Sequence, residues 1–224
     1  VALELGRRGC QVLLLERQRF PRWKVCGACL NEAAQGALAH AGLDGLVARA
    51  CAPRLSELRI TGWGRTAHVA LRESVALSRE ALDQALVRAA VERGVVFVQG
   101  ASAELGPVRN GERTLTVRGG GGEQNVRARV VVSAAGLHGL RSPTLAGPVP
   151  LAMVRAGSRV GVGAVLEGGA AGYGPGAVHM VVGGAGYVGL VRQEDERLNA
   201  AAALDAEFVR RYGSPDRAVR AHLE

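Results

Sequence analysis

The pattern of apolar and polar positions predicts alternating helices and strands in the first part of the chain. Residues 1–8 have helical spacing and precede Gly9, and the apolar run 10–16 closes on Glu16. A short continuous apolar run after a helix is typical of a buried strand in a parallel sheet. We therefore expect this segment to be the second half of a βαβ unit.

The clearest helical pattern of the chain is 78–94, which Ser78 can cap and Gly94 can end. A second helix is expected over 31–41. Strands are expected over 55–62, 65–73, 95–100, 113–118 and 123–136. Within the last of these, the run 128–134 is apolar enough to predict a buried strand.

From about residue 151 the pattern changes to glycine-rich segments in which apolar and small residues alternate. Alternation with a period of two is typical of strands with one covered face. The strands expected here are 154–167, 177–183, 186–193 and 197–205, followed by a final helix from about 204. The fold class predicted is α/β with a parallel sheet, beside a smaller antiparallel sheet.

Charge changes this picture little. The net charge is +8, and Lys24 is the only lysine among 28 basic residues. The arginines are scattered rather than gathered with aromatic residues, so we expect no nucleic-acid partner. No apolar stretch has the length of a membrane span, which leaves contact with a membrane surface as the only membrane association considered. With no secretion signal, the prediction is a cytoplasmic protein with reduced thiols.

The segment FPRWKVCGACL, 20–30, contains Cys26 and Cys29 in a C-x-x-C arrangement. A thiol-disulfide site would use Cys26 as nucleophile at a helix start. A zinc site would need a second ligand pair, which Cys10 and Cys51 do not form, so no metal is expected. The other two interpretations are a loop that approaches a cofactor through Gly27 and a plain surface loop, and these alternatives stay open at this point.

Glu16 adds a second candidate feature. In a dinucleotide-binding βαβ unit, an acid that ends the second strand accepts hydrogen bonds from the adenosine ribose. The glycine-rich turn of that unit would lie before Val1. Because the chain opens in what reads as the middle of a helix, we expect a piece that lacks both ends.

Three stretches in the same order resemble the geranylgeranyl reductase and p-hydroxybenzoate hydroxylase-like flavoproteins. They are GRRGCQVLLLERQRFPRWKVCGACLNEAA, SREALDQALVRAAVERGVVFVQGASA and GYVGLVRQEDERLNAAAALD. The resemblance implies a Rossmann-type FAD-binding domain from 1–56 and 77–147. It implies an antiparallel substrate domain from 57–76 and 148–224, which is incomplete.

The resemblance also implies cofactor contacts at seven positions. These are Glu16, Arg17, Cys26, Gly27, Arg79, Ala103 and Gly136. Arg79 would approach the phosphate side of the flavin nucleotide, although no acidic partner for it is obvious in the sequence. Ala103 would back the adenine. Ala135 stands where the family usually has an aspartate before Gly136, which weakens the case for an ordinary NAD(P)H-driven hydroxylase.

The resulting hypothesis is an FAD-dependent oxidoreductase, of reductase or monooxygenase type, that acts on a small or isoprenoid-like molecule. NAD(P)H is the candidate electron donor, and no catalytic residue is named because the flavin supplies the redox chemistry. A halogenase would need a lysine for halide transfer. The only lysine, Lys24, lies on the cofactor loop, so halogenation ranks lowest. The alternatives are a thiol-disulfide redox protein that uses Cys26 and Cys29, and a nucleotide-binding module without turnover.

Overall fold

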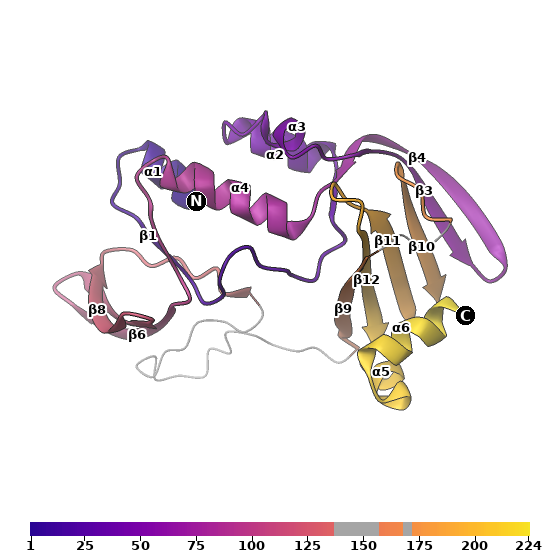
Figure 1. Cartoon of the computed structure of the whole chain (residues 1–224). Helices are drawn as coiled ribbons and strands as arrows, with labels where there is room; N and C mark the ends of the chain where they lie inside the picture. The colour runs from indigo at the N-terminus through magenta and orange to yellow at the C-terminus, as the bar shows by residue number, and fades with distance from the viewer. Residues whose placement is uncertain (137–156, 168–171) are drawn as a thin grey trace. The chain divides into compact units, whose positions relative to one another are not determined.

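A computed structural model describes residues 1–136, 157–167 and 172–224 (Figure 1). The chain divides into two compact units, one formed by residues 1–22 and 86–155 and the other by 23–85 and 156–224. The division falls within helix α4 (Arg79–Val91). The domain bounds expected from the sequence stay a prediction.

A two-stranded parallel sheet lies in the first unit. It pairs β1 (Leu13–Glu16) with β5 (Val96–Gln99), and Glu16 is the register partner of Gln99. Helix α1 (Ala2–Arg7) precedes β1. The expected order of helix, glycine and parallel strand is confirmed. The strand is shorter and less buried than expected, and Cys10 lies exposed in the irregular segment before it rather than in a buried strand.

Close packing beside α1 explains a glycine in the middle of that helix. A Cβ atom at Gly6 would lie 2.8 Å from the carbonyl oxygen of Arg93 and 3.0 Å from a methyl group of Val95. The first of these distances is shorter than any ordinary contact. Only glycine therefore fits where α1 meets the segment that leads into β5.

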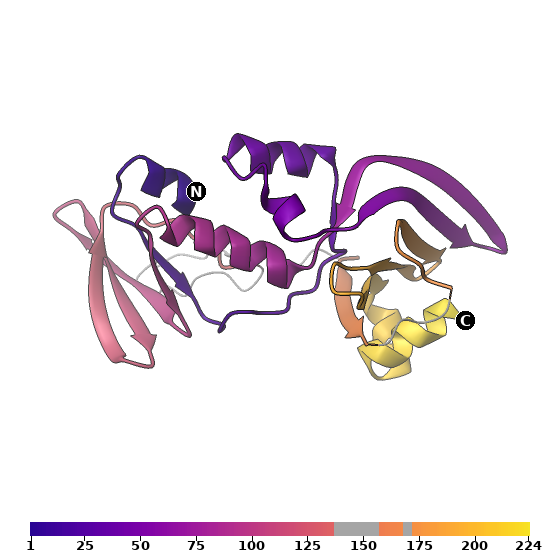
Figure 2. The same cartoon turned by 45° about the horizontal axis from the view of Figure 1, so that its top comes forward.

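The first unit also contains a three-stranded antiparallel sheet, drawn in pink in Figure 2. Its strands are β6 (Ser102–Arg109), β7 (Glu112–Gly119) and β8 (Gly122–Ala128). The hairpin expected at the glycine run is confirmed, since Gly119 and Gly122 are register partners.

The strand predicted over 128–134 is wrong. Residues 130–135 are irregular, and the side chains of Val130 and Val132 are 77% and 59% exposed. A buried parallel strand must bond to neighbouring strands, and in the described part of the chain β1 and β5 pair only with each other in their sheet. The apolar run therefore has no strand to pair with.

The second unit contains a seven-stranded sheet in the order β2-β4-β3-β10-β11-β12-β9. The strands are β2 (Cys29–Leu30), β3 (Arg54–Gly62), β4 (Arg65–Ala76), β9 (Arg159–Leu166), β10 (Ala177–Gly183), β11 (Gly186–Arg192) and β12 (Leu198–Asp205). All neighbours are antiparallel except β3 and β10. The antiparallel strands expected in the C-terminal part are thus present, with one parallel junction to the earlier hairpin.

Local signals fix the hairpin between β3 and β4. Trp63 and Gly64 form its two-residue turn with φ angles of 49° and 70°. Two consecutive left-handed residues are what a tight turn of this hand requires. The Trp63 side chain is 78% exposed, so it packs into no core.

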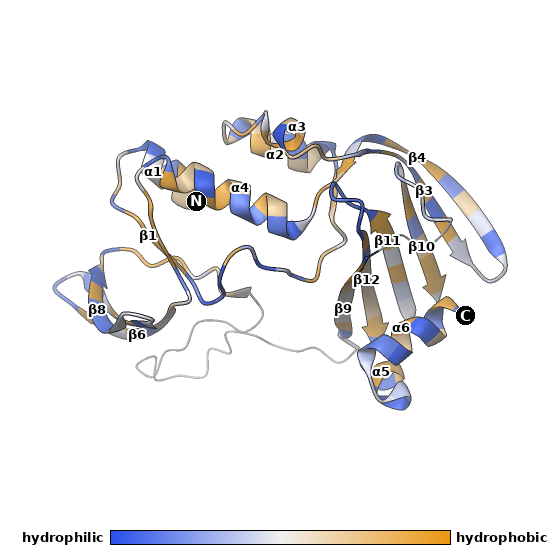
Figure 3. Ribbon diagram, viewed as in Figure 1, coloured by the Kyte–Doolittle hydropathy of each residue, from blue (hydrophilic) through white to orange (hydrophobic). Residues whose placement is uncertain are grey.

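The second unit buries hydrophobic side chains on both faces of its sheet. On one face β11 and β12 pack against α5 (Ala206–Tyr212) and α6 (Pro215–Leu223), through Val188, Leu204 and Ala218 among others. Figure 3 shows hydrophobic residues along these strands and hydrophilic ones on the two helices. A second cluster joins Ala28, Leu55, Ala76, Val178 and Val191.

Two further helices, α2 (Glu32–His40) and α3 (Leu46–Arg49), complete the second unit. The Asn31 side chain caps α2 by accepting a hydrogen bond from the amide of Ala34 at 2.9 Å. Among the residues that the structure describes, no helix combines the length and the apolar character needed to cross a membrane.

Candidate functional site

The carboxylate of Glu16 stands at the end of β1, as expected for a residue that follows a parallel strand. The main-chain amide of Gln18 donates to its Oε1 at 2.9 Å, and Nε of Arg22 lies 3.3 Å from Oε2. The Glu16 side chain is 26% exposed. A carboxylate can accept about four hydrogen bonds, so these contacts orient the group and leave acceptor sites for a ligand.

The loop after β1 is held against β5. Gln99 Oε1 accepts a hydrogen bond from the amide of Phe20 at 2.7 Å, and the rings of Phe20 and Phe97 meet edge to face at 5.4 Å. The guanidinium of Arg22 lies 5.5 Å from the centre of the Phe20 ring. These contacts fix Arg22 beside Glu16. The ion pair between Arg22 and Glu16 was not predicted from the sequence.

The first unit also contains the predicted site residues Arg17, Ala103 and Gly136. Arg17 is exposed directly after Glu16, and Ala103 is half-buried in β6, where it pairs with Val117. The amide of Ala101 donates to the carbonyl of Glu16 at 3.0 Å, which brings the start of β6 to the end of β1. Gly136 is exposed with a φ of 68°.

In the second unit the segment Cys26 to Cys29 forms a loop anchored at three points. Asn199 donates to the carbonyl of Cys26 at 2.9 Å, and the amide of Leu77 donates to the carbonyl of Ala28 at 2.8 Å. Cys29 then enters β2 as the register partner of Ala76. The Asn199 contact spans 173 residues of sequence, and no local sequence pattern predicts it.

Gly27 exposes its main chain within this anchored loop. No atom lies within 4 Å of the position that its Cβ would take. A ligand can therefore approach the backbone here, which is the role that the sequence analysis gave to Gly27.

Arg79 and Asp83 form a bidentate ion pair on α4. Nε and Nη2 of Arg79 lie 3.0 and 2.8 Å from the two carboxylate oxygens of Asp83. This bond raises the pKa of Arg79, and the Cys26 side chain, which also interacts with the guanidinium, raises it further. The expectation that Arg79 has no obvious partner is wrong. The spacing of four residues was readable in the sequence as a helical ion pair.

The two cysteines of the loop have different surroundings. The sulfur of Cys29 lies 3.1 Å from the carbonyl oxygen of Gly27 and donates to it. Although the Cys29 residue as a whole is exposed, desolvation of its sulfur, and then the charge of Cys26, raise the pKa of Cys29 to about 11. Cys29 is therefore a neutral thiol near pH 7.

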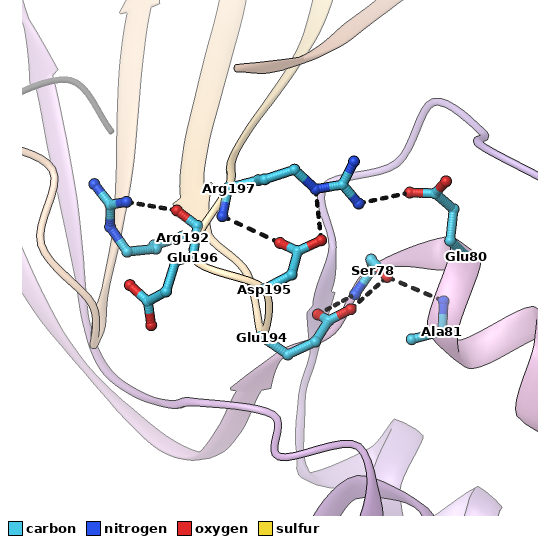
Figure 4. A network of polar contacts seen from close by, with 8 residues as sticks. All are labelled: Ser78, Glu80, Ala81, Arg192, Glu194, Asp195, Glu196 and Arg197. Atoms are coloured by element: carbon cyan, nitrogen blue, oxygen red, sulfur yellow. Dashed lines mark hydrogen bonds and ion pairs between the residues drawn. The ribbon is translucent and has the colours of Figure 1, made fainter. Parts of the chain in front are cut away.

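The start of α4 is tied to the turn between β11 and β12 by a network of polar contacts (Figure 4). Glu194 accepts hydrogen bonds from the hydroxyl of Ser78 at 2.6 Å and from its amide at 2.9 Å. Arg197 links Glu80, at 3.1 Å, to Asp195, at 2.5 Å. The same Ser78 hydroxyl accepts from the amide of Ala81, which confirms the expected helix cap.

A shallow hollow of about 320 Å³ lies beside this network, lined by Trp23, Glu80, Gly163, Ala164, Val165 and Arg197. The Trp23 ring lies 3.1 Å from where a Cβ of Gly163 would be, so glycine lets the indole approach β9 closely. The hollow thus combines an aromatic ring with an ion pair.

No protein-family model matches this sequence, and no curated protein matches it significantly. Solved structures do match. The myxobacterial chondrochloren halogenase, an FAD-dependent halogenase, superposes with a TM-score of 0.79 at 20% identity over 99% of this chain and 53% of its own.

Two further structures extend the comparison. A flavoprotein/dehydrogenase from Cytophaga hutchinsonii has a TM-score of 0.75 at 16% identity, over 99% of this chain and 57% of that one. A geranylgeranyl bacteriochlorophyll reductase-like protein from Thermoplasma acidophilum has a TM-score of 0.73 at 15% identity, over 98% and 57%. The chain spans about half the length of these structures. It has the fold of part of these flavoproteins, so the expected resemblance is confirmed at the level of the fold.

Proposed function

We propose that the chain is part of an FAD-dependent oxidoreductase. The observation that supports this most directly is the oriented, solvent-reachable carboxylate of Glu16 at the end of a parallel strand. This is the place where an acid accepts hydrogen bonds from the ribose of a bound dinucleotide. The fold shared with flavin-dependent enzymes gives the proposal its context.

The residues present fit the recognition of FAD on two counts. Glu16 keeps acceptor sites beyond its contacts with Gln18 and Arg22. Gly27 is exposed, and among the described residues no atom lies within 4 Å of the position that its Cβ would take. The other predicted cofactor contacts, at Arg17, Cys26, Arg79, Ala103 and Gly136, are part of the proposal as well.

The flavin, when bound, would supply transfer of one or two electrons. The protein residues have the remaining tasks. Glu16 would accept the ribose hydroxyls in an orientation fixed by Arg22. Arg79, clamped by Asp83, would present a positive charge without the entropy loss of ordering a free side chain.

The finer assignments belong to this proposal as well. They are a reductase or monooxygenase reaction on a small or isoprenoid-like molecule, NAD(P)H as electron donor, a cytoplasmic location, and at most surface contact with a membrane. Because the matched structures include halogenases, an activity screen should contain chloride and bromide as well as quinone, phenol and polyprenyl substrates.

The first experiment purifies the full-length protein, releases any ligand by heat and identifies it by chromatography with fluorescence detection. FAD at about one per chain supports the proposal. A folded protein that contains no flavin, and takes up none on addition of FAD, contradicts it. Bound FAD that no reductant reduces would favour the module without turnover.

The matched variants are Glu16→Gln and Glu4→Gln. Glu4 also pairs with an arginine, at 3.0 Å, but lies on the exposed surface of α1. Loss of a charge-assisted hydrogen bond costs about 1.5–3 kcal/mol. Glu16→Gln should therefore weaken FAD binding at least tenfold by equilibrium titration, and Glu4→Gln should leave it unchanged.

A further inference from the structure

The loop of Cys26 and Cys29 has features that flavin recognition does not use. Both cysteines are free thiols. The loop backbone is held by Asn199 at Cys26, by Leu77 at Ala28 and by pairing with β4 at Cys29. Ala28 between them has a left-handed φ of 53°, which turns the chain sharply. Two thiols are thus kept within one short, fixed turn.

The surroundings of the two sulfurs suit different steps of one reaction. The guanidinium of Arg79, clamped by Asp83, interacts with the Cys26 side chain. Reactive cysteines typically lie beside a cation and are partly exposed, and Cys26 has both features. The thiol of Cys29 instead donates to the carbonyl of Gly27 at 3.1 Å and stays protonated.

The two sulfurs also act on one another. Negative charge on Cys26 raises the pKa of Cys29, in addition to the effect of burial. When Cys26 is converted to an uncharged group, that contribution disappears and Cys29 ionises more readily. Reaction at Cys26 therefore prepares Cys29 for the next step.

We propose that Cys26 and Cys29 form a reversible disulfide within this loop, with Cys26 as the thiol that reacts first with a hydroperoxide. Every group in the proposal belongs to the second unit of the chain. Cys26 and Arg79 are also proposed flavin contacts, but the oxidation itself needs only the two thiols, Arg79 and a hydroperoxide.

The reaction balances with hydrogen peroxide as oxidant. The Cys26 thiolate attacks one peroxide oxygen, so that an S–O bond forms, the O–O bond breaks and hydroxide leaves as water after protonation. The product is a sulfenic acid. The sulfur of Cys29 then attacks the sulfur of Cys26, the S–S bond forms, and the S–O bond breaks with release of a second water. Two thiols are oxidised, one peroxide is reduced, and a dithiol reductant reverses the change.

The sequence provides a direct assay. Trypsin cleaves after Lys24 and after Arg49, and the peptide 25–49 contains Cys26 and Cys29 but neither Cys10 nor Cys51. The full-length protein is treated with limiting hydrogen peroxide, alkylated and digested. We expect peptide 25–49 to lose two hydrogens and to escape alkylation, while the peptides of Cys10 and Cys51 remain alkylated. Dithiothreitol should restore both thiols of peptide 25–49.

Two variants test the assigned roles. Cys29→Ser removes the second sulfur, so dimedone should label a sulfenic acid at Cys26. Arg79→Gln should slow peroxide oxidation of peptide 25–49 at least fivefold, whereas Arg88→Gln, on an exposed position of the same helix, should not. Full alkylation of peptide 25–49 after peroxide treatment would overturn the proposal. So would oxidation no faster than that of Cys10 and Cys51, or an unchanged rate in Arg79→Gln.

Discussion

Glu194, in the turn between β11 and β12, accepts hydrogen bonds from both the amide and the hydroxyl of Ser78, at 2.9 and 2.6 Å. Ser78 is 3% exposed and caps α4 with the same hydroxyl. One carboxylate therefore fixes the start of a helix that is 116 residues away in sequence. The contact stabilises the helix start and the sheet turn together.

Replacement of Glu194 by alanine should destabilise the protein. It leaves the Ser78 amide without its acceptor, and loss of such a charge-assisted bond costs about 1.5–3 kcal/mol. The free energy of unfolding in urea measures the loss. Glu196→Ala is the control from the same turn, since the Glu196 side chain is exposed and the bonds of this residue to Arg192 and Gln193 come from its main chain. Equal losses for the two variants would show that the turn, rather than the Ser78 contact, is responsible.

Local sequence signals predicted much of the fold. The helix 78–94 was predicted from a capping serine and a terminal glycine, and the strands 55–62 and 65–73 from their pattern of residues, and all three are present. These signals work because a cap or a tight turn is formed mainly by residues that are close in sequence. The strand 128–134 was predicted from apolarity alone and is wrong, because a strand also needs a partner.

The candidate site was less predictable from the sequence, because it too depends on partners that are distant in sequence. Asn199 holds Cys26 across 173 residues, and Glu194 holds Ser78 across 116. Neither partner has a pattern of its own in the sequence. The pairs of Arg79 with Asp83 and of Arg22 with Glu16 are closer in sequence. The former has the spacing of a helical ion pair and could have been found.

The Arg79–Asp83 pair should stabilise the protein more than an exposed pair of the same spacing. The side chains of Arg79 and Asp83 are 25% and 11% exposed, against 71% and 49% for Arg8 and Glu4. Removing one partner of a largely buried pair leaves a charge without compensation. Asp83→Ala should therefore lower the free energy of unfolding by about 2–3 kcal/mol.

The control is Glu4→Ala, which disrupts an exposed pair worth about 0.5 kcal/mol or less. Arg79→Lys separates charge from geometry, because lysine keeps the charge and cannot bond both oxygens. The loss in free energy of unfolding for Arg79→Lys should lie between those of Asp83→Ala and Glu4→Ala. If Asp83→Ala and Glu4→Ala unfold at the same urea concentration, burial does not strengthen the pair.

Two helical glycines should respond to alanine in opposite directions. At Gly6 a new Cβ would lie 2.8 Å from the carbonyl oxygen of Arg93, whereas at Gly36 in α2 it would meet nothing within 4 Å. Overpacking costs about 1–3 kcal/mol. Replacing an unhindered helical glycine by alanine gains about 0.5–1 kcal/mol. Gly6→Ala should therefore lower the temperature of thermal unfolding, and Gly36→Ala should raise it. A higher unfolding temperature for Gly6→Ala would show that α1 can move away from Arg93.

Alkylation of Cys29 should show a pH dependence set by its raised pKa. Only the thiolate reacts with iodoacetamide, and burial together with the charge of Cys26 raises the pKa of Cys29 to about 11. The neutral thiol is thus favoured up to that pH, and the alkylation rate should still be rising between pH 9 and 11.

In Cys26→Ser the electrostatic contribution is absent, so the midpoint should move to lower pH while the contribution of burial remains. Peptide 25–49 reports Cys29 alone in that variant, and Cys10 and Cys51 report on reagent stability in the same digest. A midpoint that does not move on removal of Cys26 would mean that the two sulfurs do not interact, and that burial alone sets the pKa of Cys29.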